Sequence, residues 1–250
     1  MEKEDSGSMK QKAVRLIFTV LLLLCVLAIL TATKRININQ YLVGGYSVKG
    51  VDVSHYQGEI DWEHFREQGI DFAFIKATEG SSLVDERFEE NREGAKAAGL
   101  YAGAYHFFSF DSTPASQAEH FIATVGDLSG SLPPVVDIEY YGDKRKNPPE
   151  KAYVVSRLRE LLEALEEEYG VKPIIYTTYT VYNRYIRNAF QEYPLWIRNV
   201  YYPPGDIGRQ WTFWQYCDTG ALGGTAGGEK FVDLNVFRES REDLLKMLVP

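Results

Sequence analysis

From residue 48 onward, short β-branched or aromatic runs alternate with polar stretches of helical period, and this alternation constrains the fold more than any other feature. The runs that predict strands are 50–54, 71–77, 101–107, 133–139, 172–177, 194–199, 212–216 and 231–235. The stretches that predict helices are 60–68, 85–98, the segment following Pro114, 149–168 and 179–190. Alternation of strands and helices predicts a parallel sheet with crossover helices.

Eight predicted strands within about 200 residues favour an α/β fold in which the sheet closes into a barrel. The gaps after the sixth and seventh strands are too irregular for full helices, so the outer ring is expected to be incomplete. A doubly wound open sheet is the alternative. No glycine-rich phosphate loop follows the first predicted strand, which weakens the nucleotide-binding version of that alternative.

The N-terminus contains an uncharged apolar run, Leu16–Thr33. At ~1.5 Å per residue this run spans nearly the ~30 Å hydrocarbon core of a bilayer. Lys10, Lys12 and Arg15 precede it, which favours an N-terminus held in the cytoplasm. An uncleaved signal anchor is predicted, although Ala32 leaves a cleaved signal peptide as the alternative.

The chain is therefore expected to have three parts. Residues 1–35 form a cytoplasmic tail and a transmembrane or signal helix, residues 36–48 form a linker, and residues 49–250 form the barrel. In either version of the N-terminus, the barrel leaves the cytoplasm.

Charge and cysteine content exclude several classes of function. A net charge of −8 and a pI of about 5.2 disfavour nucleic-acid binding, which needs a basic surface. The two cysteines, Cys25 and Cys217, are not expected to form a disulfide, and no Cys/His cluster predicts structural zinc. Aromatic residues make up 14% of the chain and serve equally as core or as platforms on which sugar rings stack.

Polar residues gather at the ends of the predicted strands: Asp52, Glu79, His106, Asp137, Glu139, Tyr176, Arg198, Gln215 and Asp233. In a β/α barrel the C-terminal ends of the strands share the face that carries the active site. These residues are therefore expected to converge.

The triplet Asp137–Ile138–Glu139 is the sharpest local signal. The two-residue period of a strand places both carboxyl groups on one side, ~6–7 Å apart. Apolar residues precede them, so desolvation and mutual repulsion should raise the pKa of one acid and make it a proton donor near neutral pH. Glycosidic cleavage requires such a pair. The structural alternative is that the two acids cap a helix or pair with an arginine, and Asp52 and Asp233 on the same rim favour catalysis.

Two other chemistries are weaker. His55 and His106, with Asp52, resemble part of the metal site of a polysaccharide deacetylase, but the further histidines of that site are missing from a chain with only 4 His. Cys217 follows a strand without an obvious histidine partner, so a packed thiol is expected. No metal or cofactor is predicted.

Several segments, in this order, carry a family resemblance: GVDVSHYQGEIDW, FAFIKATEG, AGAYHFF, LPPVVDIE, WTFWQY and VDLNVF. They resemble family 25 glycoside hydrolases, the Chalaropsis-type lysozymes, over residues 50–237. The resemblance implies an irregular barrel of eight strands and five helices, and an N-acetylmuramidase that cleaves the β-1,4 bond from N-acetylmuramic acid to N-acetylglucosamine with retention. Peptidoglycan in the bacterial cell envelope is then the substrate, and a monomer is expected.

The resemblance also implies residue roles. Glu139 matches the general acid/base, Asp137 matches the acid that orients the 2-acetamido group of the substrate, and Asp52 and Asp233 match two further acids of the pocket floor. The nucleophile stays open between the acetamido oxygen and a carboxylate. The residues expected to bind substrate are Glu79, His106, Tyr176, Trp196, Arg198 and Gln215.

One position departs from the family pattern. Many members read LWxAxY after the sixth strand, whereas this chain has Arg198 there. Arg198 is expected either to contact the lactyl carboxylate or stem peptide of the substrate or to pair with a pocket acid. The alternative to an enzyme is a catalytically inactive glycan-binding barrel, which the presence of all four acids disfavours.

Overall fold

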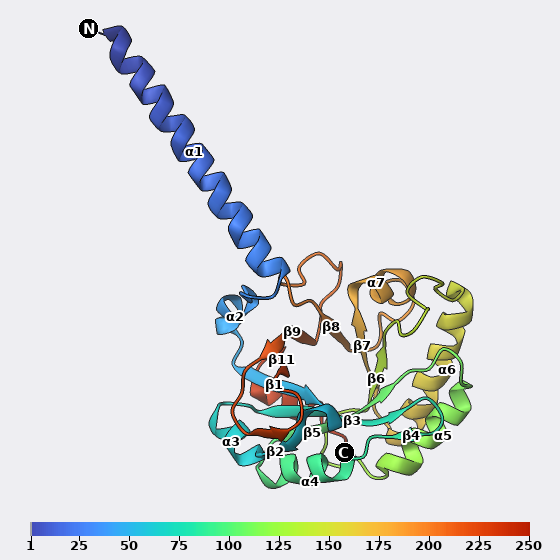
Figure 1. Ribbon diagram of the computed structural model, residues 1–250. Helices are drawn as coiled ribbons and strands as arrows, with labels where there is room; N and C mark the ends of the chain where they lie inside the picture. Colours follow the sequence, from blue (N-terminus) through green and yellow to red (C-terminus); the bar gives the residue numbers. More distant parts are fainter. Residues whose placement is uncertain (1) are drawn as a thin grey trace.

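The computed structural model describes residues 2–250, with side chains from Met9 onward. Eight strands close into a barrel, confirming the predicted fold (Figure 1). In order around the barrel they are β1 (Val48–Val53), β3 (Phe72–Glu79), β5 (Tyr101–Phe107), β6 (Val135–Ile138), β7 (Ile174–Thr178), β8 (Leu195–Arg198), β9 (Phe213–Gly220) and β11 (Val232–Phe237). Parallel pairing of β1 with β3 and antiparallel pairing of β1 with β11 complete the closure.

The last strand, β11, runs against the others. It pairs antiparallel with both β1 and β9, whereas strand–helix alternation alone predicts parallel pairing throughout. The physical reason is the connection from β9 to β11, which carries no crossover helix and therefore turns the chain back on itself. That connection contains β10 (Thr225–Gly227), which pairs with β2 (Gly58–Ile60). A further short strand, β4 (Leu83–Val84), pairs antiparallel with the end of β3.

The helices cover the early part of the barrel, so the outer ring is incomplete as expected. They are α3 (Trp62–Glu67), α4 (Phe88–Ala97), α5 (Pro114–Val125), α6 (Lys151–Tyr169) and α7 (Tyr179–Val181), which continues into a π-helical turn η3 (Tyr182–Ile186). A short helix not predicted from the sequence, α8 (Arg241–Leu245), follows the barrel. The start of α5 is fixed by the Thr113 hydroxyl, which accepts from the Ser116 amide at 3.2 Å.

The interior of the barrel is layered. Inward-facing aromatic side chains fill its lower part, where the rings of Phe74 and Trp196 stack with centroids 4.5 Å apart. Gly103 makes room for this layer, because a Cβ atom there would lie 2.7 Å from the ring of Phe74. The aromatic floor forces the polar inward-facing residues of the same strands into the upper part of the barrel.

The N-terminal helix α1 (Glu2–Ala32) projects away from the barrel (Figure 1). Its segment Met9–Ala32 is long and apolar enough to cross a membrane, and none of it is buried. The chain then forms α2 (Asn39–Leu42) and a 3₁₀ turn η1 (Val43–Gly45) before β1 begins. The predicted linker 36–48 is thus partly helical, and Asn39 within it is fully buried.

Candidate active site

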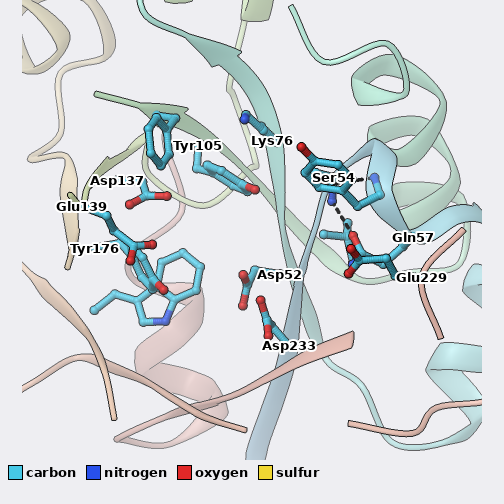
Figure 2. Close-up of a pocket in the computed structure, with 14 residues that line it drawn as sticks. Asp52, Ser54, Gln57, Lys76, Tyr105, Asp137, Glu139, Tyr176, Glu229 and Asp233 are labelled. Carbon is cyan, nitrogen blue, oxygen red and sulfur yellow. Dashed lines mark hydrogen bonds between the residues drawn. The ribbon is translucent and has the colours of Figure 1, made fainter. Parts of the chain in front are cut away.

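A cavity of about 250 Å³ opens at the C-terminal ends of the parallel strands (Figure 2). It is lined by Asp52, Val53, Ser54, Tyr56, Gln57, Lys76, Tyr105, Phe107, Asp137, Glu139, Tyr176, Trp196, Glu229 and Asp233. The four acids predicted to be catalytic therefore meet in one cavity, as do two of the six residues predicted to bind substrate.

Asp52 and Asp233 face one another across β1 and β11, where they are register partners (Figure 2). The sequence placed Asp233 late in its strand, but it is the second residue of β11. Asp233 reaches the rim because β11 is antiparallel, so that the beginning of this strand lies beside the end of β1.

Amide side chains hold Asp52 in place. Gln215 Nε2 donates to both carboxylate oxygens of Asp52, at 2.9 and 3.0 Å, and Asn235 Nδ2 donates to one of them at 2.6 Å. These amides are themselves fixed, because Tyr176 Oη donates to Gln215 Oε1 at 2.9 Å and Trp196 Nε1 donates to Asn235 Oδ1 at 2.8 Å. Gln215 thus holds Asp52, which lines the cavity, and does not line the cavity itself.

Burial opposes ionisation of this pair. It raises the pKa of Asp52, against the hydrogen bonds from Asn235 and Gln215, which favour the charged form. Burial and the neighbouring Asp52 carboxylate raise the pKa of Asp233 to about 9. The hydrogen bonds show which acid of the pair carries the proton. The amide donors favour an ionised Asp52, so Asp233 is the partner that keeps a proton near neutral pH.

Asp137 and Glu139 form the opposite wall. Asp137 lies in β6 and Glu139 directly follows it, while Ile138 between them is fully buried on the other face. Asp137 Oδ1 is buried without a hydrogen-bond partner. Burial and then repulsion by Glu139 raise the pKa of Asp137 well above its ordinary value.

The Glu139 carboxyl is more moderately affected. Burial raises its pKa, and the positive charge of Arg198 opposes that rise. Both carboxyl groups thus have raised pKa values, which is the direction that the proton donor of a glycosidase requires. The sequence predicts a raised pKa for one acid of the triplet, whereas burial raises the pKa of both Asp137 and Glu139.

Lys76 and Tyr105 line the cavity but were not singled out in the sequence. Lys76 Nζ donates to Glu79 Oε2 at 2.7 Å, so Glu79 reaches the site through Lys76 rather than by lining it. The ammonium group also lowers the pKa of Asp137, against the effect of burial. Lys76 lies within the apolar run that predicts β3, and the two-residue period of the strand places it on the inward face with Phe72 and Phe74.

His106 was predicted to bind substrate, and its position does not allow this. It is fully buried, with Nδ1 at 2.7 Å from Thr78 Oγ1 and Nε2 at 3.0 Å from Gln117 Oε1. The reason is strand parity: Tyr105 and Phe107 face the cavity, so His106 between them faces helix α5. Burial lowers its pKa to about 4.

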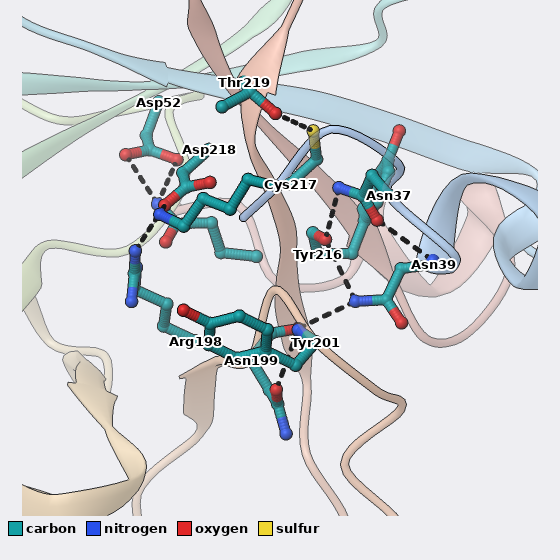
Figure 3. Close-up of polar contacts among 12 residues, drawn as sticks. Asn37, Asn39, Asp52, Arg198, Asn199, Tyr201, Tyr216, Cys217, Asp218 and Thr219 are labelled. Atoms are coloured by element: carbon teal, nitrogen blue, oxygen red, sulfur yellow. Dashed lines mark hydrogen bonds and ion pairs between the residues drawn. The ribbon is translucent and has the colours of Figure 1, made fainter. Parts of the chain in front are cut away.

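Arg198 lies at the edge of the site without lining the cavity. Its Nη2 atom donates to Asp218 Oδ2 at 2.6 Å (Figure 3). Of the two roles considered for Arg198, this contact favours pairing with an acid, although Asp218 is not a lining residue of the cavity. The arginine still acts on the site through its charge, because it lowers the pKa of Glu139 and of Asp233.

Further lining residues come from loops that the strand pattern does not describe. Ser54 and Gln57 form a capping box after β1, in which Gln57 Oε1 accepts from the Ser54 amide at 2.9 Å. Glu229 enters from the connection between β10 and β11. No local signal in the sequence marks Glu229, because the antiparallel return of the chain brings it to the rim.

A β/α barrel whose mouth gathers four carboxyl groups, one buried and three half-buried, defines a glycosidase-type site. Residues 51–225 match glycosyl hydrolases family 25. The chain belongs to this family, and it is a glycoside hydrolase of the lysozyme class.

Individual proteins are similar to this chain over most of its length. A family 25 glycosyl hydrolase from Bacillus anthracis is 46% identical, with a TM-score of 0.77 and coverage of 81% of this chain and 94% of that one. Lysozyme M1 of Streptomyces globisporus is 36% identical over 80% of this chain and 71% of its own length. The uncharacterized protein YegX of Escherichia coli K12 is 38% identical over 80% of this chain and 72% of its own length.

Proposed function

We propose that this lysozyme is a membrane-anchored N-acetylmuramidase that cleaves the β-1,4 bond from N-acetylmuramic acid to N-acetylglucosamine with retention of configuration. Glu139 is the general acid/base, and Asp137 orients the 2-acetamido group of the substrate. Asp52 and Asp233 form the floor of the pocket. Hydrolysis of peptidoglycan places the barrel outside the cytoplasm, and we assign residues 1–35 to the anchor and 49–250 to the catalytic barrel.

The observation that carries the proposal is the pair at the end of β6. A buried carboxyl oxygen without a hydrogen-bond partner costs ~1–3 kcal/mol, so Asp137 Oδ1 can gain a hydrogen bond from a ligand. The amide N–H of a 2-acetamido sugar supplies such a donor. Glu139, two residues along, is then placed for the glycosidic oxygen.

Substrate binding also determines whether Asp137 or Glu139 carries the proton. In the empty pocket, burial and repulsion favour a protonated Asp137. A hydrogen bond donated by the acetamido N–H favours the ionised form of Asp137. The resulting negative charge in turn favours a protonated Glu139, so binding transfers the acidic proton to the residue that needs it.

With Asp137 ionised and holding the acetamido group, the acetamido oxygen is oriented toward the anomeric carbon. We propose that this oxygen is the nucleophile, that Glu139 protonates the leaving oxygen, and that Glu139 then removes a proton from the incoming water. Two inversions at one carbon give net retention. Asp52, held by Gln215 and Asn235, supplies negative charge facing the cavity that stabilises the positive charge of the transition state.

The test is the stereochemistry of the first product. The full chain in detergent is incubated with soluble glycan fragments, and the anomer released is followed by NMR before mutarotation. Retention gives the β-anomer, and Glu139→Gln should abolish its appearance. Release of the α-anomer would contradict the proposed mechanism, and binding without any cleavage would favour the inactive glycan-binding alternative.

A further inference from the structure

The segment that joins α1 to the barrel, residues 33–47, is packed against the catalytic domain, and this segment forms the foot of α1. Asn39 Nδ2 donates to the backbone oxygens of Asn199 and Tyr216, at 3.0 and 3.1 Å, and Asn37 Nδ2 donates to the Tyr216 oxygen at 3.2 Å (Figure 3). Asn39 is fully buried, and Val43 joins the core. The foot of α1 is therefore held against β9 and the loop after β8 rather than hanging on a flexible chain.

A chain of charges connects this foot to the active-site rim. Lys34, two residues after the end of α1, pairs with Asp218. Asp218 also binds Arg198, at 2.6 Å (Figure 3). Arg198 in turn acts on the charge of Glu139. Lys34 and Asp218 thus link the end of the apolar helix to Arg198 at the edge of the catalytic site.

Beside this foot lies an apolar hollow of about 530 Å³. Its lining combines the last turns of α1 with one residue of the linker and one of the barrel domain: Leu24, Leu27, Ala28, Thr31, Ala32, Ile38 and Tyr201. Tyr201 lies on the loop between β8 and β9, which lies beside the foot of α1 (Figure 1). Tyr201 and its neighbour Tyr202 are 46% and 48% exposed.

The charges that flank the apolar run set the depth of this hollow. Met9–Ala32 includes Lys10, Lys12 and Arg15, and its uncharged part, residues 16–32, spans about 26 Å at ~1.5 Å per residue, less than the ~30 Å hydrocarbon core. The end of α1 and the basic residues Lys34 and Arg35 that follow it therefore lie at the boundary between the hydrocarbon core and the headgroup region. Tyrosine side chains are enriched at that level because the ring is apolar and the hydroxyl stays hydrated.

We infer that the loop carrying Tyr201 and Tyr202 rests in the headgroup region of the bilayer beside α1, so that the catalytic rim is held next to the membrane surface. The occupant of the hollow is phospholipid, because the hollow is lined mainly by the apolar helix and the basic residues Lys34 and Arg35 directly follow that helix in the chain. The enzyme then works on glycan close to the membrane. This inference rests on the membrane anchor of the proposed function.

The test uses the full chain reconstituted into phosphatidylcholine–phosphatidylglycerol vesicles, with part of the phospholipid brominated on its acyl chains. Bromine quenches tryptophan on contact. Tyr201→Trp is compared with Tyr153→Trp, a control on α6 with matched exposure of 47%, away from the foot of α1 (Figure 1). The four native tryptophans are buried in the barrel domain and give the same background in both variants.

The added fluorescence of Tyr201→Trp should be quenched and that of Tyr153→Trp should not. Adding Asn39→Ala to Tyr201→Trp should reduce the quenching, while cleavage of soluble glycan fragments shows that the barrel is folded. Equal quenching at positions 201 and 153 in vesicles that float with the protein would overturn the docking and leave the anchor intact. Failure of the chain to float with the vesicles would overturn both.

Discussion

Replacing Asp233 with asparagine should stabilise the protein at neutral and alkaline pH. Burial beside Asp52 raises the pKa of Asp233 from 3.8 to about 9 in the folded chain. The unfolded chain releases this proton above about pH 4, whereas the folded chain keeps it until about pH 9. The folded state thus binds more protons in this window, so the stability from this group is full below pH 4 and is lost as pH rises toward 9.

The size of the effect follows from linkage. One proton contributes a slope of about 1.36 kcal/mol per pH unit, so between pH 5 and pH 8 this group lowers the free energy of unfolding by about 4 kcal/mol at most. Asparagine keeps the shape and the neutral charge of the protonated acid, and it can still donate to Asp52. Asp233→Asn should therefore remove this part of the pH dependence while lowering activity, a trade of function for stability.

The assay is thermal unfolding of the detergent-solubilised chain by circular dichroism at pH 5 and pH 8. For a domain of this size, 1 kcal/mol corresponds to about 2–4 °C in Tm, so the gain of Asp233→Asn over the unsubstituted chain should reach several degrees at pH 8 and shrink at pH 5. Asp143→Asn, at an exposed carboxylate, is the control and should show no such pH-dependent gain. A Tm gain for Asp233→Asn that is equal at both pH values, or a loss at pH 8, would refute the reasoning.

Three further predictions concern catalysis. Asp137→Asn should lower kcat by about 10²-fold or more while leaving the Kd for glycan fragments nearly unchanged, because it weakens the transition-state contact; an unchanged kcat would make Asp137 structural. The pH profile of kcat/KM should be bell-shaped, and Arg198→Gln should move its alkaline limb to higher pH, because removing the cation raises the pKa of Glu139; a limb that moves down would contradict the sign. Excess EDTA should leave the rate unchanged, whereas loss of activity restored by added metal would support a metal-dependent deacetylase.

Much of the fold could be predicted from the sequence, because the two-residue period of strands and the 3.6-residue period of helices both depend on residues close together in the chain. All eight barrel strands and the five helical segments around them lie where the hydrophobic pattern predicts them. The direction of β11 was not accessible, since it depends on a helix-free connection whose path is set by pairing between β2 and β10. The same return explains why Asp233 reaches the rim from the beginning of its strand.

The candidate site likewise contains residues that strand parity predicts and contacts that it does not predict. Asp137, Glu139, Tyr176 and Trp196 line the cavity because strand parity carries them inward. The same rule places His106 on the outward face, because Tyr105 and Phe107 on either side of it face the cavity. Other features depend on contacts between distant segments: Lys34 with Asp218, and Asn235 with Asp52. No local pattern contains such pairings.

The central claim is that this chain cuts the glycan on the reducing side of N-acetylmuramic acid and that Glu139 supplies the proton. Mass spectrometry of borohydride-reduced products, after digestion of purified peptidoglycan by the full chain, tests it most directly. The account predicts fragments ending in reduced N-acetylmuramic acid, absent with Glu139→Gln. Fragments ending in reduced N-acetylglucosamine, deacetylated but uncleaved glycan, or undiminished cleavage by Glu139→Gln would contradict it.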